Sequence, residues 1–371
     1  MKKLLIGASF CLLAISSITA QKYQFTTVKD IENTEVKSQG RTGTCWSFST
    51  TSFLESEIIR LTGKQIDLSE MYTVRNTYSA KAVNYLYRQG KAQFSEGGLA
   101  HDVINSVADK GLVPEQTFTG LDLGQDKHNH AELIAVLKSM LDAYIKNPAR
   151  KLSPRWKQAV EGVLNVYLGK NKEEFSFEGK NYTPKTFAEY VKIDPANYVT
   201  LSSFEHAKKY DKFILNIPDN FSNGAFYNVS LNELVSVTEE AIKNGYTVAL
   251  DCDVSEKTFS SKAGVAVVPA ISGENKKALK EIVEEKNITA SYRQSEFENF
   301  NTTDDHLMHI VGIVKDQKGN TYFKVKNSWG NKQGNQGYVY MSISYFKLKT
   351  ISVLLHKDGI SSSLKNKLNI K

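Results

Sequence analysis

A single cysteine, Cys45, stands between small residues and a tryptophan in the segment GRTGTCWSFS, directly ahead of a helical pattern. A thiol becomes a strong nucleophile when it is ionised, and the amide groups and dipole of a helix N-terminus favour the thiolate. The alternative interpretation is a buried structural cysteine, which is a common role of a free thiol. A nucleophile would also need a base and a donor to an oxyanion. Whether the rest of the sequence provides them decides between a nucleophilic and a structural cysteine.

Two further side chains have the chemistry that such a nucleophile needs. Gln39 lies six residues before the cysteine, and its amide and the backbone N–H of Cys45 could donate to a developing oxyanion. His306, in the segment DDHLMHIVG, is the candidate base, because it begins a strand-like segment beside acidic residues. His309 lies three residues later, on the opposite face of a strand, and is predicted to be a packed core histidine.

The segment KNSWG holds the last two candidates. The amide of Asn327 could hold the imidazole of His306 in one orientation, and the indole of Trp329 could cover the pair from water. Together with QGRTGTCWSFS and DHLMHIVG, this segment gives the order cysteine, histidine, asparagine. The three motifs in that order resemble papain-like cysteine peptidases, and Gly312, six residues after the histidine, fits the same family.

The elements that must carry these residues follow from the pattern of apolar residues. Spacings of three and four residues over 44–62 predict a helix at the cysteine, and LAHDVINSVADKG predicts another that ends at Gly111. Helices are also predicted over 129–170, broken at Pro148 and Pro154. The C-terminal third predicts a hairpin around the turn DQKGN, and strands over GYVYMSISYF and TISVLLH. Helices followed by strands indicate the α+β class.

Other segments narrow the resemblance to the branch of bleomycin hydrolase and aminopeptidase C, among them LSEMYTVRNTY, NYTPKTFAEYV, EAIKNGYTVALDCDVSEKTF and VLLHKDG. His306 follows Cys45 by 261 residues, against roughly 130 to 150 in papain-type enzymes. The resemblance therefore implies a largely helical insertion over residues 116–250. It also implies a papain-like fold of two lobes, with the cysteine on a helical lobe over 21–115. A β-rich, barrel-like lobe over 251–371 carries the histidine and the asparagine.

The resemblance assigns a role to each candidate. Cys45 would be the nucleophile, and His306 would be the base that then protonates the leaving amine. Asn327 would orient His306, and Gln39 would polarise the oxyanion. Peptide substrates would then be hydrolysed through a thioester acyl-enzyme.

Substrate contacts are implied in the same way. The backbone at Gly97 and Gly98, in SEGGLAHDV, would pair with an extended peptide beside Trp329. Cys252, in DCDVSEKTF, resembles a cysteine outside the catalytic set and is interpreted as structural. The branch lays its own C-terminal tail in the cleft, where the tail's carboxylate pairs with the substrate's amino group. The last residues here, GISSSLKNKLNIK, lack the apolar, proline-containing end of that tail. An aminopeptidase and an endopeptidase therefore both stay open.

The composition is that of a globular protein, with 371 residues, 41% of them hydrophobic and 23% charged. The net charge of +7 is spread along the chain without a basic block, so we expect no nucleic-acid partner. After the first twenty residues no stretch is long and apolar enough for a membrane span.

Residues 1–20 form a signal peptide by pattern, since two lysines precede the apolar stretch LLIGASFCLLAISSITA, which ends in small residues. We therefore expect export to the periplasm or the medium. Cys45 and Cys252 are then the cysteines of the mature chain, as free thiols or as one bridge.

Alternatives of another class are a peptide-binding protein without catalysis and a metal enzyme. The sequence HNH at residues 128–130 offers two imidazoles, but no cysteine or HExxH partner lies nearby, so we expect no metal and no other cofactor. The expected partners are peptide substrates, and the resemblance implies a homo-oligomer.

Overall fold

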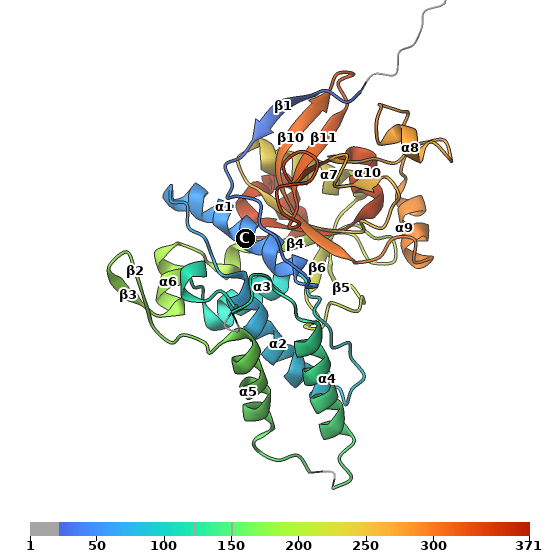
Figure 1. Cartoon of the computed structure of the whole chain (residues 1–371). Coiled ribbons are helices and arrows are strands. Elements are labelled where there is room, and N and C mark those ends of the chain that lie inside the picture. The colour runs from blue at the N-terminus through green and yellow to red at the C-terminus, as the bar shows by residue number, and fades with distance from the viewer. Residues whose placement is uncertain (1–21, 122–123, 150) are drawn as a thin grey trace, which may run out of the picture.

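The computed structural model describes residues 22–121, 124–149 and 151–371. The predicted signal peptide over residues 1–20 lies outside these ranges. Helices gather in one lobe and most strands in another, and helix α1 lies where the two lobes meet (Figure 1). Within the described ranges, no helix combines the length and the apolar character that crossing a membrane requires.

The helical lobe is built on one large apolar core. Its helices are α1 (Cys45–Thr62), α2 (Glu70–Tyr87), α3 (Ala100–Lys110), α4 (Ala131–Ile145), α5 (Trp156–Leu168) and α6 (Pro184–Tyr190). A two-stranded hairpin of β2 (Phe175–Phe177) and β3 (Lys180–Tyr182) lies beside α6. Two further helical turns, η1 (Glu115–Thr117) and η2 (Pro195–Asn197), connect these elements.

The other lobe is an eleven-stranded sheet with its own apolar core. Its strands are β1 (Phe25–Asp30), β4 (Tyr198–Ser202), β5 (Lys212–Ile214), β6 (Ala225–Asn228), β7 (Val248–Cys252), β8 (Phe259–Ser260), β9 (Val265–Ala266), β10 (His306–Asp316), β11 (Thr321–Lys326), β12 (Tyr338–Ser342) and β13 (Thr350–His356). The strands follow the order β5-β6-β4-β13-β7-β10-β11-β12-β9-β8, with β1 paired to β10. Helices of this lobe are α7 (Leu231–Lys243), α8 (Asn275–Ala278), α9 (Ala290–Glu298), α10 (Ile343–Lys349), α11 (Ser362–Leu368) and the turn η3 (Lys357–Gly359).

Strand β10 is the strand on which the two lobes meet. It is buried along nearly its whole length, because α1 covers one face and the core of the sheet lobe covers the other. Alternate side chains divide between the two sides: Leu307 packs in the core of the helical lobe, and Met308 packs in the core of the sheet lobe. The predicted hairpin around DQKGN is the antiparallel pair of β10 and β11.

Helix α1 begins at Cys45, as the apolar spacing predicts, and ends where Gly63 adopts a left-handed conformation at φ +70°. Every residue from the cysteine to Ile58 is buried, which is unusual for a helix and places α1 inside the molecule. The second predicted helix is α3, which ends at Gly111 as expected.

Gly312 is required by a close approach between strands. It lies next to an irregularity in the pairing of β10 with β11, at the point where β10 also pairs antiparallel with β1 through Asp30. A Cβ at this position would lie 2.5 Å from the carbonyl oxygen of Lys29. The glycine that the motif analysis singled out therefore serves the packing of β1 on β10.

Two predicted boundaries differ from the structure. The predicted strand GYVYMSISYF ends at Ser342, because the Ser342 hydroxyl accepts the backbone N–H of Tyr345 and starts helix α10. The segment 116–250, predicted as one helical insertion, is divided between the lobes. Helices α4 and α5 extend from the helical lobe (Figure 1), whereas β4, β5 and β6 add to the sheet beside β13, and α7 packs on it. Leu201 of β4 and most apolar residues of α7 are buried in the core of the sheet lobe, whereas Tyr198 of β4 packs in the core of the helical lobe.

The last residues of the chain lie on the sheet lobe. In α11, Leu364 and Leu368 pack into the core of this lobe, and Ile370 packs against the same core. Lys367 forms an ion pair of 2.8 Å with Glu233 of α7. The C-terminal segment is thus seated against α7.

We predict that Phe53→Ala lowers the free energy of unfolding by about 3–5 kcal/mol, because it removes a ring between the lobes. Phe53 is fully buried, with ring centroids 5.5 Å from Tyr198 and 6.1 Å from His309. The matched control is Phe300→Ala, since that ring is 83% exposed. Urea unfolding measures both variants, and equal losses of stability would contradict the placement of α1 in the core.

Candidate active site

An open cleft of about 580 Å³ lies between the lobes, and it brings together residues that are far apart in the sequence. The sequence-predicted residues that line it are Gln39, Cys45, Gly97, Gly98, His306 and Trp329. Asn327 lies behind the histidine and is 4% exposed. All seven candidates therefore converge on one place, which the motif spacing could only suggest.

The imidazole of His306 is held by an amide and covered by an indole. Its Nε2 lies 2.8 Å from Oδ1 of Asn327, and the Asn327 amide nitrogen donates to Ser261 Oγ at 3.4 Å. Because Oδ1 is an acceptor, Nε2 carries the proton in the neutral ring, and Nδ1 is the basic nitrogen. The Trp329 ring stacks on His306 with centroids 4.6 Å apart at 33°, while 42% of its surface stays exposed.

Cys45 occupies the first position of α1, at a helix start without a side-chain cap. The backbone N–H groups of a first helical turn have no intrahelical acceptor, so this end of α1 presents donors to the cleft. Burial raises the pKa of Cys45, and a hydrogen bond from the backbone of Leu307 to the sulfur acts against that rise. Strand β10 and helix α1 therefore meet directly at the nucleophile.

Burial is the largest influence on both titrating groups. Burial, with a smaller contribution from the carboxylates of Asp304, Asp251 and Asp219, raises the pKa of Cys45 to about 12. It lowers the pKa of His306 to about 4, against the hydrogen bond to Asn327, which raises it. Both shifts favour uncharged groups, so the resting pair is a thiol and a neutral imidazole. An ion pair arises when the proton passes from one to the other.

The amide of Gln39 is oriented at both ends. Its Nε2 donates to the carbonyl of Thr42 at 2.6 Å, and its Oε1 accepts the Ser328 hydroxyl at 2.6 Å. An amide nitrogen carries two hydrogens, so the second can serve an oxygen in the cleft beside the N–H of Cys45.

The two glycines differ in what they can offer a substrate. The Gly97 carbonyl already accepts from Lys81, whose ammonium also donates to the Ser95 carbonyl at 2.8 Å. A Cβ at Gly98 would meet the Trp46 indole at 3.0 Å. Both glycines line the cleft, so pairing of their backbone with an extended substrate stays a prediction, with one donor already at the Gly97 carbonyl.

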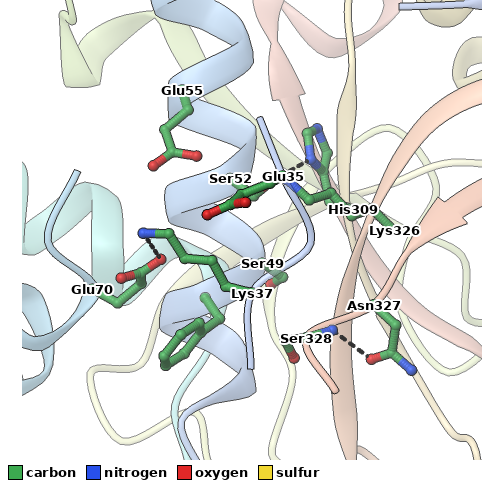
Figure 2. A pocket seen from close by; sticks show the side chains of 11 residues that line it. Glu35, Lys37, Ser49, Ser52, Glu55, Glu70, His309, Lys326, Asn327 and Ser328 are labelled. Atoms are coloured by element: carbon green, nitrogen blue, oxygen red, sulfur yellow. Dashed lines mark hydrogen bonds and ion pairs between the residues drawn. The ribbon is translucent and has the colours of Figure 1, made fainter. Parts of the chain in front are cut away.

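A buried polar layer behind the cleft fixes α1 against the sheet (Figure 2). Ser52 of α1 lies 3.0 Å from Nδ1 of His309, and the Lys326 ammonium donates to the Ser52 hydroxyl at 2.8 Å. His309 is fully buried, so its predicted role as a core histidine is confirmed.

The same layer holds an ion pair and a second glutamate. Lys37 forms an ion pair of 3.0 Å with Glu70, and the Glu55 carboxylate accepts the backbone N–H of Leu68 at 2.9 Å. Burial raises the pKa of each of these two glutamates to about 7, although Lys37 acts against it. This layer therefore positions the site without lining the cleft.

The remaining candidates take no part in the cleft. Cys252 and Cys45 are both free thiols, so the alternative of one bridge between them is not realised. Cys252 is fully buried in β7. Burial lowers the pKa of His128 to about 4 and that of His130 to about 3. Across the described ranges, no group of three or more metal-binding side chains occurs.

Sequence reasoning gave no role to the four carboxylates of the cleft, Glu96, Asp219, Asp304 and Asp305. Asp304 lies two residues before His306, and Asp219 lies in the segment PDNFSNG between β5 and β6. No local signal links Asp219 to the cleft, because the contact with Gly97 spans more than a hundred residues and exists only in the folded chain.

Comparisons with known proteins agree with the motif analysis. A model of the peptidase C1-like family matches residues 78–371. Aminopeptidase C of Listeria monocytogenes is 25% identical over 90% of this chain and 83% of its own length. Aminopeptidase C of Lactococcus lactis subsp. cremoris has the same identity and coverage. Bleomycin hydrolase of Mus musculus is 23% identical over 96% of this chain and 88% of its own.

The fold is also that of a solved structure. The crystal structure of PepW from Lactobacillus rhamnosis HN001 superposes with a TM-score of 0.73 at 18% identity, covering 93% of this chain and 84% of that one. The predicted papain-like α+β fold is therefore confirmed. The family match begins at residue 78 and does not include Cys45. The assignment of Cys45 to the site therefore rests on its position in the cleft.

We predict that Asp304→Asn moves the pH profile of Cys45 alkylation to lower pH. The Asp304 carboxylate raises the pKa of the thiol, and its own pKa of about 7 means that it is charged above neutral pH. Rates of iodoacetamide labelling should rise roughly two- to tenfold at pH 8. Asp211→Asn is the control, since that carboxylate is half exposed and paired with Lys208. An unmoved profile, or one moved to higher pH, would contradict the electrostatic account.

Proposed function

The chain belongs to the peptidase C1-like family and is a cysteine-type peptidase, and from this premise we propose that it is an aminopeptidase with Cys45 as its nucleophile. The observation that carries the proposal is the convergence of a free thiol at an uncapped helix start with an amide-held imidazole in one cleft. The names of the relatives support removal of N-terminal residues, since two of them are aminopeptidases C.

In the proposed reaction, Nδ1 of His306 takes the thiol proton as the Cys45 sulfur attacks the scissile carbonyl. The oxyanion that develops accepts hydrogen bonds from the Gln39 amide and the backbone N–H of Cys45. Asn327 holds the imidazolium, which then protonates the leaving amine and leaves a thioester on the sulfur. Water, deprotonated by the same imidazole, releases the acyl group and restores the thiol.

Because the resting pair is a thiol and a neutral imidazole, the proton passes from Cys45 to His306 during the attack on the carbonyl and not before it. Neither ion is stable alone in the buried site, but the thiolate and the imidazolium form together and stabilise each other. The Asn327 amide is already placed to stabilise the imidazolium, and the N–H donors at the start of α1 are already placed to stabilise the thiolate.

We propose also that residues 1–20 direct export, on the pattern of charge, apolar stretch and small residues alone. N-terminal analysis of the protein recovered outside the cytoplasm should show a mature chain that begins near Gln21. Recovery of an intact Met1 from the cytoplasm would refute this proposal.

We predict that Cys45→Ala abolishes hydrolysis of an aminoacyl arylamide and labelling by a thiol-directed epoxide. The alanine has no group to attack the carbonyl or to be alkylated. Cys252→Ala is the matched control, because it removes the other free cysteine of the described chain, which lies in β7 outside the cleft. That control should keep both activities, and undiminished hydrolysis by Cys45→Ala would end the proposal.

A further inference from the structure

The wall of the cleft carries four carboxylates, from Glu96, Asp219, Asp304 and Asp305. Glu96 and Asp305 each accept a backbone N–H, and so have fixed partners in the protein. The other two also line the cleft, and burial first and the Asp219 carboxylate second raise the pKa of Asp304 to about 7.

Asp219 lies directly over the glycine turn where substrate is expected. Its Oδ1 accepts from the Gln93 amide at 2.6 Å and from the Ser95 hydroxyl at 3.4 Å. Its Oδ2 lies against Gly97, so closely that a methyl group on that glycine would overlap the carboxylate. One carboxylate oxygen is therefore anchored, and the other stands at the backbone that borders the substrate.

The turn that carries Asp219 is rigid. Asn220, 6% exposed, donates to the carbonyls of Leu215 and Gly224 at 2.9 and 3.0 Å, and its oxygen accepts the Gly224 N–H at 2.8 Å. Ser222 then donates to Asp102 of α3 at 2.7 Å, which docks the segment on the helical lobe. A carboxylate held in this way is preorganised for a ligand.

On the opposite wall, Asp304 adjoins a third carboxyl that is almost fully buried. Asp251 of β7 is 1% exposed, and its Oδ2 accepts the Ser352 hydroxyl at 3.3 Å. Its Oδ1 has no donor among the described residues, and its neighbour there is the Asp304 carboxyl. Two adjacent acids can bond only by sharing a proton, so burial and repulsion raise the pKa of both.

Burial raises the pKa of Asp219, and the Lys81 ammonium acts against that rise without forming an ion pair with the carboxylate. Asp219, Asp251 and Asp304 form no ion pair within the described ranges. The buried Lys81 ammonium donates its protons to the Ser95 and Gly97 carbonyls instead. Carboxylates withdrawn from water without an ion-pair partner are costly, and a positively charged ligand lowers that cost.

We propose that Asp219 and Asp304 bind the α-ammonium group of the substrate and so direct cleavage to the N-terminal end of a peptide. An ammonium supplies the missing positive charge and three hydrogen-bond donors. The chain's own C-terminal segment does not fill this part of the cleft, because it packs on α7 and is absent from the cleft lining. The inference rests on the proposed function, since it names the residues behind its specificity.

The test compares alanyl and propionyl arylamides, which differ only in the amino group. The wild type should favour the alanyl compound. Asp219→Asn should lower kcat/KM for that compound on the order of 10- to 100-fold, which corresponds to losing a hydrogen bond to a charged group. Turnover of the propionyl compound should change no more than with the control Asp211→Asn, whose carboxylate lies outside the cleft.

Asp304→Asn is the second variant, in case the turn at Asp219 does not tolerate substitution. The asparagine at 219 keeps an acceptor for Gln93, and retained alkylation of Cys45 reports an intact fold. Both variants should lose the preference for the free amine.

The possible failures are distinguishable. If the wild type cleaves the propionyl compound as well as the alanyl one, the proposal of an aminopeptidase fails. If the wild type prefers the free amine and both asparagine variants keep that preference, the aminopeptidase stands and the assignment of these carboxylates is overturned. Efficient cleavage of N-acetyl-arginyl arylamide that is lost in Asp219→Asn would also overturn it, because the carboxylates would then bind a side-chain cation.

Discussion

The seating of helix α1 on strand β10 is the constraint on which the site depends. Cys45 is the first residue of one element and His306 the first residue of the other, so any sliding between them separates sulfur from imidazole. Apolar burial on both sides holds the pair of elements together, and the contacts of Ser52 with His309 and Lys326 fix their register. Buried polar contacts of this kind have few alternative partners, which makes the arrangement specific.

The two lobes contribute different things to the cleft. The helical lobe supplies the thiol and the helix-start donors, and the sheet lobe supplies the imidazole with the Asn327 amide. The segment between β5 and β6 crosses from the sheet lobe to α3 and brings Asp219 with it. The negative charge that results disfavours a free thiolate, and a bound ammonium would relieve that effect at the moment of reaction.

The sequence was sufficient for the parts of the site that lie inside short motifs. The apolar spacing after Cys45 predicts α1, and the ordered motifs around His306 and Asn327 predict which residues meet. The addition of β4, β5 and β6 to the sheet was not predictable, because short strands are defined by partners from distant segments. The same holds for Asp219, whose importance comes from its contact with Gly97. Helix α10 was missed because its capping Ser342 sits inside a strand-like run.

The measurement that tests the central claim most directly is trapping of the acyl intermediate, since it asks whether residues 261 positions apart act as one unit. A slowly hydrolysed aminoacyl ester is mixed with the protein, the reaction is quenched in acid, and peptides are mapped by mass spectrometry. The account predicts an acyl group on the Cys45 sulfur of the wild type and none in His306→Ala. Acylation of a different residue, or an equal rate of acylation in His306→Ala, would contradict it.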